Sequence, residues 1–210
     1  MGPEATIDLY SKIIKIWQKN GALYDSDFPE IIIYNLPLPD IVENPEDKEK
    51  IKSFLIKGVK KLESAGSSFI AVPCNSACFF IKDMRKSVSI PIISIPELIK
   101  GKNLGILGTE FTIKNKLYKN TINPAKKQQK QITKVIMNIL AGKKTEQDRD
   151  IIIKIIEDLK SKGAKKVILG CTELPLLIKR LDAINTIDVL SKEVFRQYKL
   201  CELKTRRKIK

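Results

Sequence analysis

The chain has 210 residues, of which 43% are hydrophobic and 30% are charged, and its formal net charge is +15. This balance excludes a disordered chain, and no apolar run reaches the roughly 18 residues that a membrane-spanning helix requires. The sequence holds no histidine, which excludes a Ser-His or Cys-His nucleophile pair and a histidine metal site.

The first predicted helix begins near Thr6, after a tight loop at the start of the chain. A β-branched run over residues 31–34, ended by Asn35, predicts a buried strand. The next helix is expected over residues 45–64 and ends at Gly66, because glycine is common just past a helix C-terminus. The apolar stripe expected on the first helix consists of Ile7, Tyr10, Ile13, Ile14 and Trp17.

The rest of the chain repeats this alternation of short apolar strands with longer helices, which is typical of an α/β protein with parallel sheets. We expect two pseudo-symmetric lobes, each a parallel sheet flanked by helices, with the active site in the cleft between them. Residues 1–101 and 190–210 would form the first lobe and residues 102–189 the second. Further strands are expected over 69–72, 92–95, 104–109, 167–169 and 184–189, and helices over 77–87, 112–118, 132–140, 149–162 and 190–198.

Four cysteines, at positions 74, 78, 171 and 201, lack the paired spacing of a zinc site. Free thiols in a reduced compartment are the simplest interpretation, so we expect a cytoplasmic protein without a secretory signal. The lysines are spread over most of the predicted helices, and only residues 204–210 form a dense basic run. This charge pattern favours solvated helix faces over a nucleic-acid surface.

Two segments share one pattern, in which a cysteine stands eight positions after a glycine: Gly66 with Cys74, and Gly163 with Cys171. An apolar run precedes each cysteine and a small polar pair follows it. Loops at the carboxyl ends of parallel strands carry the ligands of such sheets, and backbone N–H groups stabilise a thiolate there. A single buried cysteine often packs as an inert hydrophobe, but the matched pair predicts two thiols that act together.

Two equivalent thiols suit racemisation. A proton must leave one face of a carbon and another must arrive on the opposite face, so two acid/base groups are needed. An α-proton beside a carboxylate is only weakly acidic, so its removal also needs a positioned base and stabilisation of the developing charge.

The chain contains three motifs: Met1-Gly2-Pro3-Glu4-Ala5-Thr6, Pro73-Cys74-Asn75-Ser76-Ala77-Cys78 and Gly170-Cys171-Thr172-Glu173. Through these motifs it resembles the aspartate/glutamate racemase family, which is independent of pyridoxal phosphate. Segments at 107–109 and 142–149 extend the resemblance over essentially the whole chain. It implies a cofactor-free racemase of a small acidic amino acid, aspartate or else glutamate. It also implies a homodimer that does not associate with a membrane.

The resemblance also implies roles for individual residues. Cys74 and Cys171 would be the acid/base pair, and Glu173 would either support the site or serve the first turn of a helix. Lys143 or Lys144 would supply charge to a distal carboxylate, although solvated surface suits both. Helix capping is the alternative role for the hydroxyls at 76 and 109. The residues expected to line the cleft or bind substrate are Met1, Asn75, Ser76, Ala77, Thr109 and Thr172.

Three features depart from the family pattern. The family's opening strand, central to the first sheet, has no counterpart ahead of Met1, and a missing central strand leaves its neighbours with unpaired backbone groups. Ile41 follows Asp40 where aspartate-specific members carry Arg, the usual partner of a carboxylate. Cys78 replaces the usual histidine of the first cysteine motif.

Two alternatives stay open. One keeps the fold and changes the reaction to that of a related isomerase or a hydantoin-type racemase. The other is a non-catalytic homologue that binds ligands or nucleic acid through its basic surface. The Gly-Cys-Thr-Glu ending favours the aspartate or broad-specificity branch, and the presence of both thiols favours racemisation.

Overall fold

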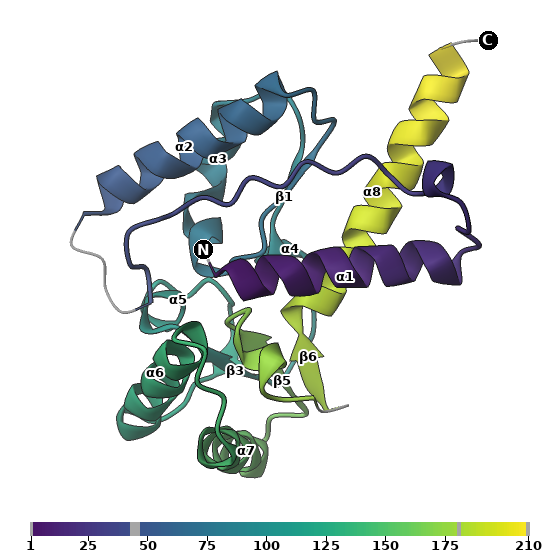
Figure 1. Cartoon of the computed structure of the whole chain (residues 1–210). Helices are drawn as coiled ribbons and strands as arrows, with labels where there is room; N and C mark the ends of the chain where they lie inside the picture. Colours follow the sequence, from purple (N-terminus) through teal and green to yellow (C-terminus); the bar gives the residue numbers. More distant parts are fainter. Residues whose placement is uncertain (1, 43–46, 180–181, 209–210) are drawn as a thin grey trace.

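The structure, a computed structural model, describes residues 2–42, 47–179 and 182–208 (Figure 1). It is an α/β protein with parallel sheets flanked by helices, which confirms the predicted fold class. Within these ranges, no helix is long and apolar enough to cross a membrane. The helices are α1 Pro3–Lys19, α2 Lys48–Ser64, α3 Ile81–Lys86, α4 Ile95–Leu98, α5 Glu110–Lys114, α6 Lys126–Leu140, α7 Glu146–Ser161 and α8 Thr186–Lys208; the strands are β1 Ile70–Ala71, β2 Ile92–Ile93, β3 Leu104–Gly108, β4 Thr121–Ile122, β5 Lys166–Gly170 and β6 Ala183–Asn185.

The strands form two sheets. β1 and β2 make a two-stranded parallel pair, and the other four lie in the order β4-β3-β5-β6, also parallel. β3 and β5 run side by side over their full length and end together at Gly108 and Gly170. A Cβ at Gly170 would lie 3.1 Å from the carbonyl oxygen of Leu107, so a side chain there would require the adjacent strand to shift. The division into two lobes at the predicted boundaries stays a prediction.

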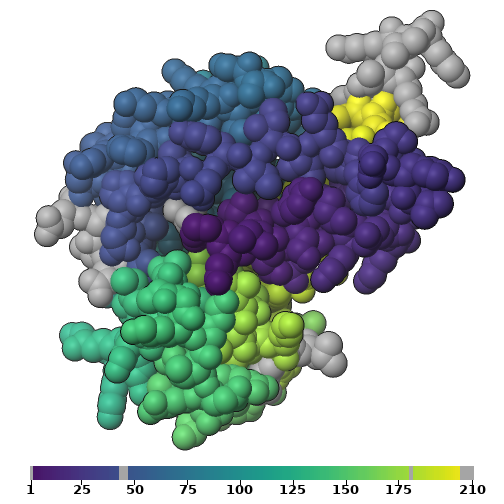
Figure 2. Space-filling view, viewed as in Figure 1, coloured from purple at the N-terminus to yellow at the C-terminus, as the bar shows by residue number. Residues whose placement is uncertain are grey.

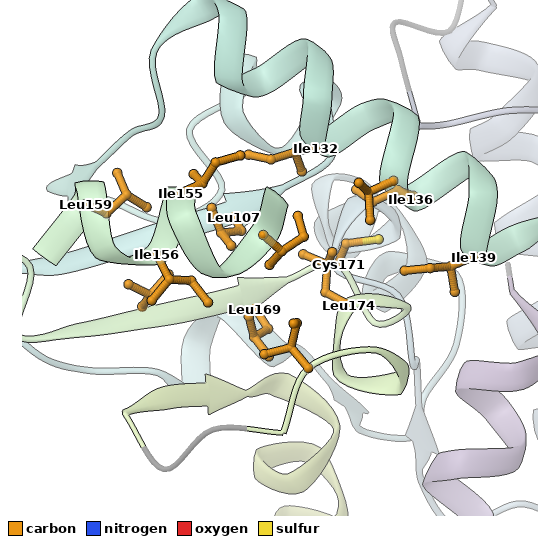
Figure 3. Close-up of a cluster of buried hydrophobic side chains, with 14 of the residues drawn as sticks. Leu107, Ile132, Ile136, Ile139, Ile155, Ile156, Leu159, Leu169, Cys171 and Leu174 are labelled. Carbon is orange, nitrogen blue, oxygen red and sulfur yellow. The ribbon is translucent and has the colours of Figure 1, made fainter. Parts of the chain in front are cut away.

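The core of the four-stranded sheet is formed by α6 and α7, which pack against β3 and β5 (Figure 3). Apolar residues recur at helical spacing on both helices, and those faces are buried. Leu107 on β3 and Leu169 on β5 project into this cluster, and Cys171 lies at its edge. The second thiol is therefore held by the same packing that holds the sheet.

Replacing Leu107 by alanine is expected to lower the free energy of unfolding by about 2–5 kcal/mol, because the side chain is 0% exposed and its removal leaves a cavity. The matched control is Leu140→Ala, since that leucine is 44% exposed at the end of α6; its effect should stay below about 0.5 kcal/mol. Chemical denaturation of both variants measures the difference, and equal effects would contradict the assignment of Leu107 to the core.

The first and last helices pack against each other beside the two-stranded sheet (Figure 1). The ring of Trp17 on α1 meets the rings of Phe195 and Tyr198 on α8 edge to face, with centroids 4.8 and 5.1 Å apart. α8 begins directly after β6 in the four-stranded sheet and packs against α1 farther along. It therefore connects the two sheets.

The strand predicted over residues 31–34 is wrong. This segment has no ladder partner, and Ile33 is 52% exposed. A cavity of about 740 Å³ lies between it and β1. A strand requires a neighbour to pair with its backbone groups, and here the neighbouring position is hollow.

The apolar stripe predicted for α1 is also partly wrong. Ile7 is 67% exposed and Tyr10 is half-exposed, although Ile13 and Trp17 are buried as expected. The buried face consists of Ala5, Leu9, Ile13 and Trp17, spaced four residues apart. Both sets fit a helical period, so the sequence alone did not select the face that meets α8. Similarly, the strand predicted over 184–189 ends at Asn185, where α8 begins.

Candidate active site

The two cysteine motifs meet at one place in the fold. Cys74 follows β1 and Cys171 directly follows β5, as the spacing predicted. The hydroxyl of Thr172 donates a hydrogen bond of 3.1 Å to the carbonyl oxygen of Pro73, so the residue after one cysteine contacts the residue before the other. Cys74 packs against the hydrophobic cluster of the first sheet and Cys171 belongs to that of the four-stranded sheet. The two cysteine loops meet between these clusters. Neither cysteine forms a disulfide.

Cys171 is buried beside a carboxylate. Its Sγ lies 3.0 Å from Oε2 of Glu173 and donates a hydrogen bond to it. Figure 3 shows the thiol among the apolar side chains of Ile136, Ile139 and Leu174. Burial raises the pKa of this thiol well above its usual value, and the charge of Glu173 raises it further, against a smaller opposing effect of the Glu173 backbone amide. Cys171 is therefore protonated at neutral pH and suited to donate a proton.

Cys74 is half-buried and has a different set of partners. Burial again raises its pKa, and the charge of Glu173 adds to that effect. The backbone amides of Ala77 and Ser76 hydrogen-bond to the sulfur and oppose the rise, because they stabilise the thiolate. The charge of Cys74 in turn raises the pKa of Cys171, so the two sulfurs lie within electrostatic reach. Cys74 therefore has two backbone donors for a thiolate, against one at Cys171.

Glu173 is the buried acid between these groups. Its Oε2 also accepts a hydrogen bond of 3.1 Å from the hydroxyl of Thr172. Its Oε1 faces Gly2, where an added Cβ would lie only 1.9 Å away, so a side chain at position 2 would displace the carboxylate. Gly2 caps the N-terminus of α1, whose dipole favours a negative charge. Glu173 thus contacts the thiol of Cys171 directly, and its role in the site stays a prediction.

Replacing Glu173 by glutamine is expected to move the pH–rate profile to lower pH. The charge of Glu173 raises the pKa of both Cys74 and Cys171, so its removal lowers both values and the reactive thiolate forms at lower pH. Glutamine keeps the size and a hydrogen-bond acceptor for Thr172. Steady-state rates between pH 6 and pH 10 measure the shift, and Glu63→Gln is the control because Glu63 binds Ser89 elsewhere. An unchanged profile, or a shift to higher pH, would contradict this role.

Asn75 is held by two side chains that the sequence analysis missed. The hydroxyl of Tyr118 donates to Oδ1 of Asn75, and Nδ2 of Asn75 donates to Oγ1 of Thr186 over 3.3 Å. Thr186 in turn donates to the carbonyl oxygen of Leu169 over 2.9 Å. Tyr118 and Thr186 come from segments far from the cysteine motifs, so no local signal identifies them. The network fixes the amide and leaves one of its two N–H donors for a ligand.

Ser76 and Thr109 lie together in the structure. Their hydroxyl oxygens are 2.9 Å apart, and Thr112, which the sequence analysis did not select, lies 3.1 Å from Ser76. Thr109 also caps α5 by accepting a hydrogen bond of 3.0 Å from the amide of Thr112. Thr109 therefore both caps α5 and contacts the first cysteine loop. Ala77 of that loop is fully buried.

Other predicted residues lie apart from the thiols or outside the structure. Lys143 is exposed, and the described residues show no side-chain contact for it; Lys144 pairs with Glu4 over 2.7 Å. Met1 lies outside the described residues. Ile41 is buried in the core beside α2. In the described part of the chain, no cluster of three or more His, Cys, Asp or Glu side chains is placed to hold a metal ion.

Cys78, which replaces the family histidine, is a packing residue. It is buried, and its Sγ donates a hydrogen bond of 3.4 Å to the carbonyl oxygen of Cys74. Burial raises the pKa of Cys78 to about 12, so this thiol stays neutral at physiological pH. Its contribution is to hold the loop that carries Cys74.

Known proteins resemble the chain over most of its length. It is 29% identical over 197 residues to the broad-specificity amino-acid racemase RacX of Bacillus subtilis, a match that covers 87% of this chain and 86% of the relative. It is also 29% identical over 184 residues to a glutamate racemase of Persephonella marina, covering 78% and 70% of the two chains.

Solved structures agree with this. An aspartate racemase homologue from Pyrococcus horikoshii superposes with a TM-score of 0.72 at 29% identity, covering 93% of this chain and 94% of that one. The aspartate racemase of Picrophilus torridus has the same fold, with a TM-score of 0.78 at 23% identity over 93% and 90% of the two chains. The model of the Asp/Glu/hydantoin racemase family matches residues 1–191. The chain therefore belongs to the Asp/Glu/hydantoin racemase family.

Proposed function

We propose that the chain is a cofactor-independent isomerase that racemises aspartate, or else glutamate, with Cys74 and Cys171 as its acid/base pair. One observation carries this proposal: two thiols follow parallel strands on loops that touch through Thr172 and Pro73. The relatives support the class of reaction, since they include racemases of broad specificity, glutamate racemases and an aspartate racemase.

The two thiols divide the reaction. The Cys74 thiolate, backed by the amides of Ser76 and Ala77, removes the α-proton from one face of the substrate. The thiol of Cys171 then gives its proton to the opposite face. This leaves Cys171 as a thiolate, which takes a new proton from solvent before the next turnover. The reverse reaction exchanges the two roles. The two thiols alone transfer protons to and from the α-carbon in this proposal.

The substrate carboxylate would be held beside Cys74. The free N–H of Asn75 and the hydroxyls of Ser76 and Thr109 are the donors proposed for it. Thr172 of the second loop would line the site beside them, since its one hydroxyl proton is shared between Pro73 and Glu173. These donors would stabilise the charge that develops on the carboxylate when the α-proton leaves. Since Ile41 is buried in the core, it takes no part in binding the distal carboxylate, and Lys143 stays a proposal for that role.

Deuterium exchange tests this function. The protein is incubated in heavy water with each enantiomer of aspartate and of glutamate, and with a substituted hydantoin. Loss of the α-proton signal and chiral chromatography are followed together. We expect exchange and interconversion of both aspartate enantiomers. Turnover of the hydantoin alone would move the chain to the hydantoin-type alternative, and exchange of none of these compounds would overturn the proposal.

The remaining parts of the hypothesis are independent of that test. A homodimer, a cytoplasmic location, the lack of a cofactor and the lack of a nucleic-acid partner all stay predictions. Sedimentation at several protein concentrations addresses the first, and a salt-dependent shift of DNA mobility would contradict the last.

A further inference from the structure

A further thiol lies beside Cys74. Cys78 stands four residues after it, in the short 3₁₀ helix Ser76–Phe80 that follows the first cysteine loop. The Sγ of Cys78 lies 3.4 Å from the carbonyl oxygen of Cys74. Racemisation as proposed above uses Cys74 and Cys171, so it leaves the thiol of Cys78 without a chemical role.

The two active-site thiols differ in exposure. Cys171 is 6% exposed and belongs to the cluster of the four-stranded sheet. On the face shown in Figure 2, the start of α1 (purple) lies against the green segment that contains α6, and there Gly2 borders Glu173 and Leu140. This cover lies beside Cys171, since Glu173 is its hydrogen-bond partner. Cys74 is half-buried and is therefore the more accessible of the two.

A small oxidant from solvent meets Cys74 before it meets Cys78, because Cys78 is only 4% exposed. The thiolate is the form of cysteine that oxidants attack. The amides of Ser76 and Ala77 hydrogen-bond to the sulfur of Cys74 and stabilise this form. Burial raises the pKa of Cys74, so a mildly alkaline solution favours the reaction.

Cys78 has the surroundings of a second reacting thiol. Burial raises its pKa to about 12, and the amide of Ile95 and the hydroxyl of Ser94 hydrogen-bond to the sulfur and oppose that rise. The charge of Cys74 adds to the rise, so the two sulfurs lie within electrostatic reach. A thiol of high pKa forms few thiolates, but each of them is a strong nucleophile. The short separation offsets the low thiolate fraction, because attack within one chain needs no encounter.

A bridge between the two residues needs a local movement of the loop. Residues three or four apart on a helix have Cβ atoms about 5–6 Å apart, whereas a disulfide needs about 3.5–4.5 Å. Cys74 lies outside the 3₁₀ helix, and its amide donates to the carbonyl oxygen of Val72 over 2.8 Å. The amide of Cys78 is held in the helical turn by the carbonyl oxygen of Asn75 at 3.0 Å. The movement therefore falls on Cys74, whose sulfur leaves its two backbone donors.

We propose that Cys74 and Cys78 form a site of reversible oxidation by peroxide, in which Cys78 is the resolving thiol. The Cys74 thiolate attacks one oxygen of hydrogen peroxide and breaks the O–O bond, which gives a sulfenic acid and a hydroxide that is protonated to water. The Cys78 thiolate then attacks the sulfur of Cys74. An S–S bond forms, and the S–O bond breaks to release a second hydroxide, which is also protonated to water. The two sulfurs together lose two electrons, and the peroxide gains them.

Such a bridge would switch the site off and protect it. This consequence rests on the proposed function, because a disulfide at Cys74 leaves no thiolate to take the α-proton. A sulfenic acid that stays unresolved is open to irreversible oxidation to sulfinic acid, and the bridge prevents that step. A disulfide that distorts its loop is also readily reduced, so a dithiol would restore Cys74.

Peptide mapping tests the bridge without reference to catalysis. The reduced protein is treated with a few equivalents of hydrogen peroxide at pH 8.5, blocked with iodoacetamide in denaturant and digested with trypsin without reductant. Trypsin leaves both cysteines in one peptide, residues 62–82, because no lysine or arginine lies between Lys61 and Lys82. We expect this peptide to be two hydrogen atoms lighter than its reduced form and unmodified by iodoacetamide. Dithiothreitol should restore both thiols.

The variant Cys78→Ser separates the two steps, since serine cannot form the bridge. In this variant dimedone should trap the sulfenic acid of Cys74, and excess peroxide should carry Cys74 to sulfinic acid, which dithiothreitol does not reduce. Cys201→Ala is the control, because that thiol lies on α8, and it should form the bridge as the wild-type protein does. The wild-type peptide map stands by itself if Cys78→Ser fails to fold.

Racemase activity provides a second readout. Peroxide should lower the wild-type rate at least about tenfold, and dithiothreitol should restore it, whereas the loss in Cys78→Ser should be permanent. A bridge in a chain that racemises none of the amino acids tested would support this proposal and overturn the proposed function. Irreversible loss of activity without a bridge would do the reverse.

Two further results would overturn the proposal. One is a cross-link between the peptide of residues 62–82 and the peptide that carries Cys171, which would make Cys171 the resolving thiol. The other is equal conversion of Cys74 to sulfinic acid in the wild-type protein and in Cys78→Ser, which would show that Cys78 gives no protection.

Discussion

Replacing Cys74 by alanine is expected to lower kcat/KM for aspartate racemisation by about 10²- to 10⁴-fold, the contribution of a positioned acid/base group. The same loss is expected for Cys171→Ala. Racemisation needs both thiols, since one takes the proton and the other returns it from the opposite face. The sulfurs stand on touching loops, and the charge of Cys74 raises the pKa of Cys171, which suits the proposed mechanism.

Exchange with solvent distinguishes the two variants. A single remaining thiol can remove the α-proton from the enantiomer that presents it to that face and can return deuterium to the same face. Cys74→Ala and Cys171→Ala should therefore retain slow exchange of opposite enantiomers, without interconversion. Cys201→Ala is the control, because that thiol lies on α8 away from the cysteine loops. Racemisation by either active-site variant at the wild-type rate would reject the two-thiol mechanism.

The second large effect is expected at Asn75. Asn75→Ala should lower kcat/KM by about 10²-fold, because it removes a donor proposed for the developing charge. It also leaves the hydroxyl of Tyr118 buried without its acceptor, which should cost about 1–3 kcal/mol of stability. Tyr118→Phe should have a smaller effect on rate, since it frees Asn75 to rotate but keeps the amide.

A double-mutant cycle tests whether these residues act together. Because Tyr118 acts through Asn75, the variant that carries both changes should be no slower than Asn75→Ala alone. Rates and unfolding free energies are measured for the four proteins, with Tyr24→Phe as the control because that tyrosine is exposed. Fully additive losses would show that Tyr118 does not position Asn75.

The strands and loops that carry the thiols could be predicted because their signals are local. In each cysteine segment, a short apolar run stands before the cysteine and a small polar pair follows it. This pattern is enough to predict that Cys74 and Cys171 follow parallel strands, and in the structure both do. Gly66 likewise ends a helix, since its φ of +91° suits glycine. These features depend on neighbours within a few residues.

Other features depend on residues that are distant in sequence. The partners of Asn75 come from the segment after α5 and from the start of α8, and no pattern near Tyr118 or Thr186 indicates that contact. Residues 31–34 show the composition of a strand, but pairing depends on a neighbour across the sheet. The buried position of Ile41 follows from the tertiary packing against α2. Sequence periodicity carries no information about such partners.

The length of α8 has a mechanical consequence. Its 23 residues span about 35 Å, and a helix of this length behaves as a nearly rigid rod. Thr186 at its start touches Asn75, while Val194 and Tyr198 farther along line the cavity in the first sheet. A tilt of α8 that moved the residues at one of these places would therefore move those at the other. The placement of Asn75 is thus tied to the packing of α8 against α1 beside the first sheet.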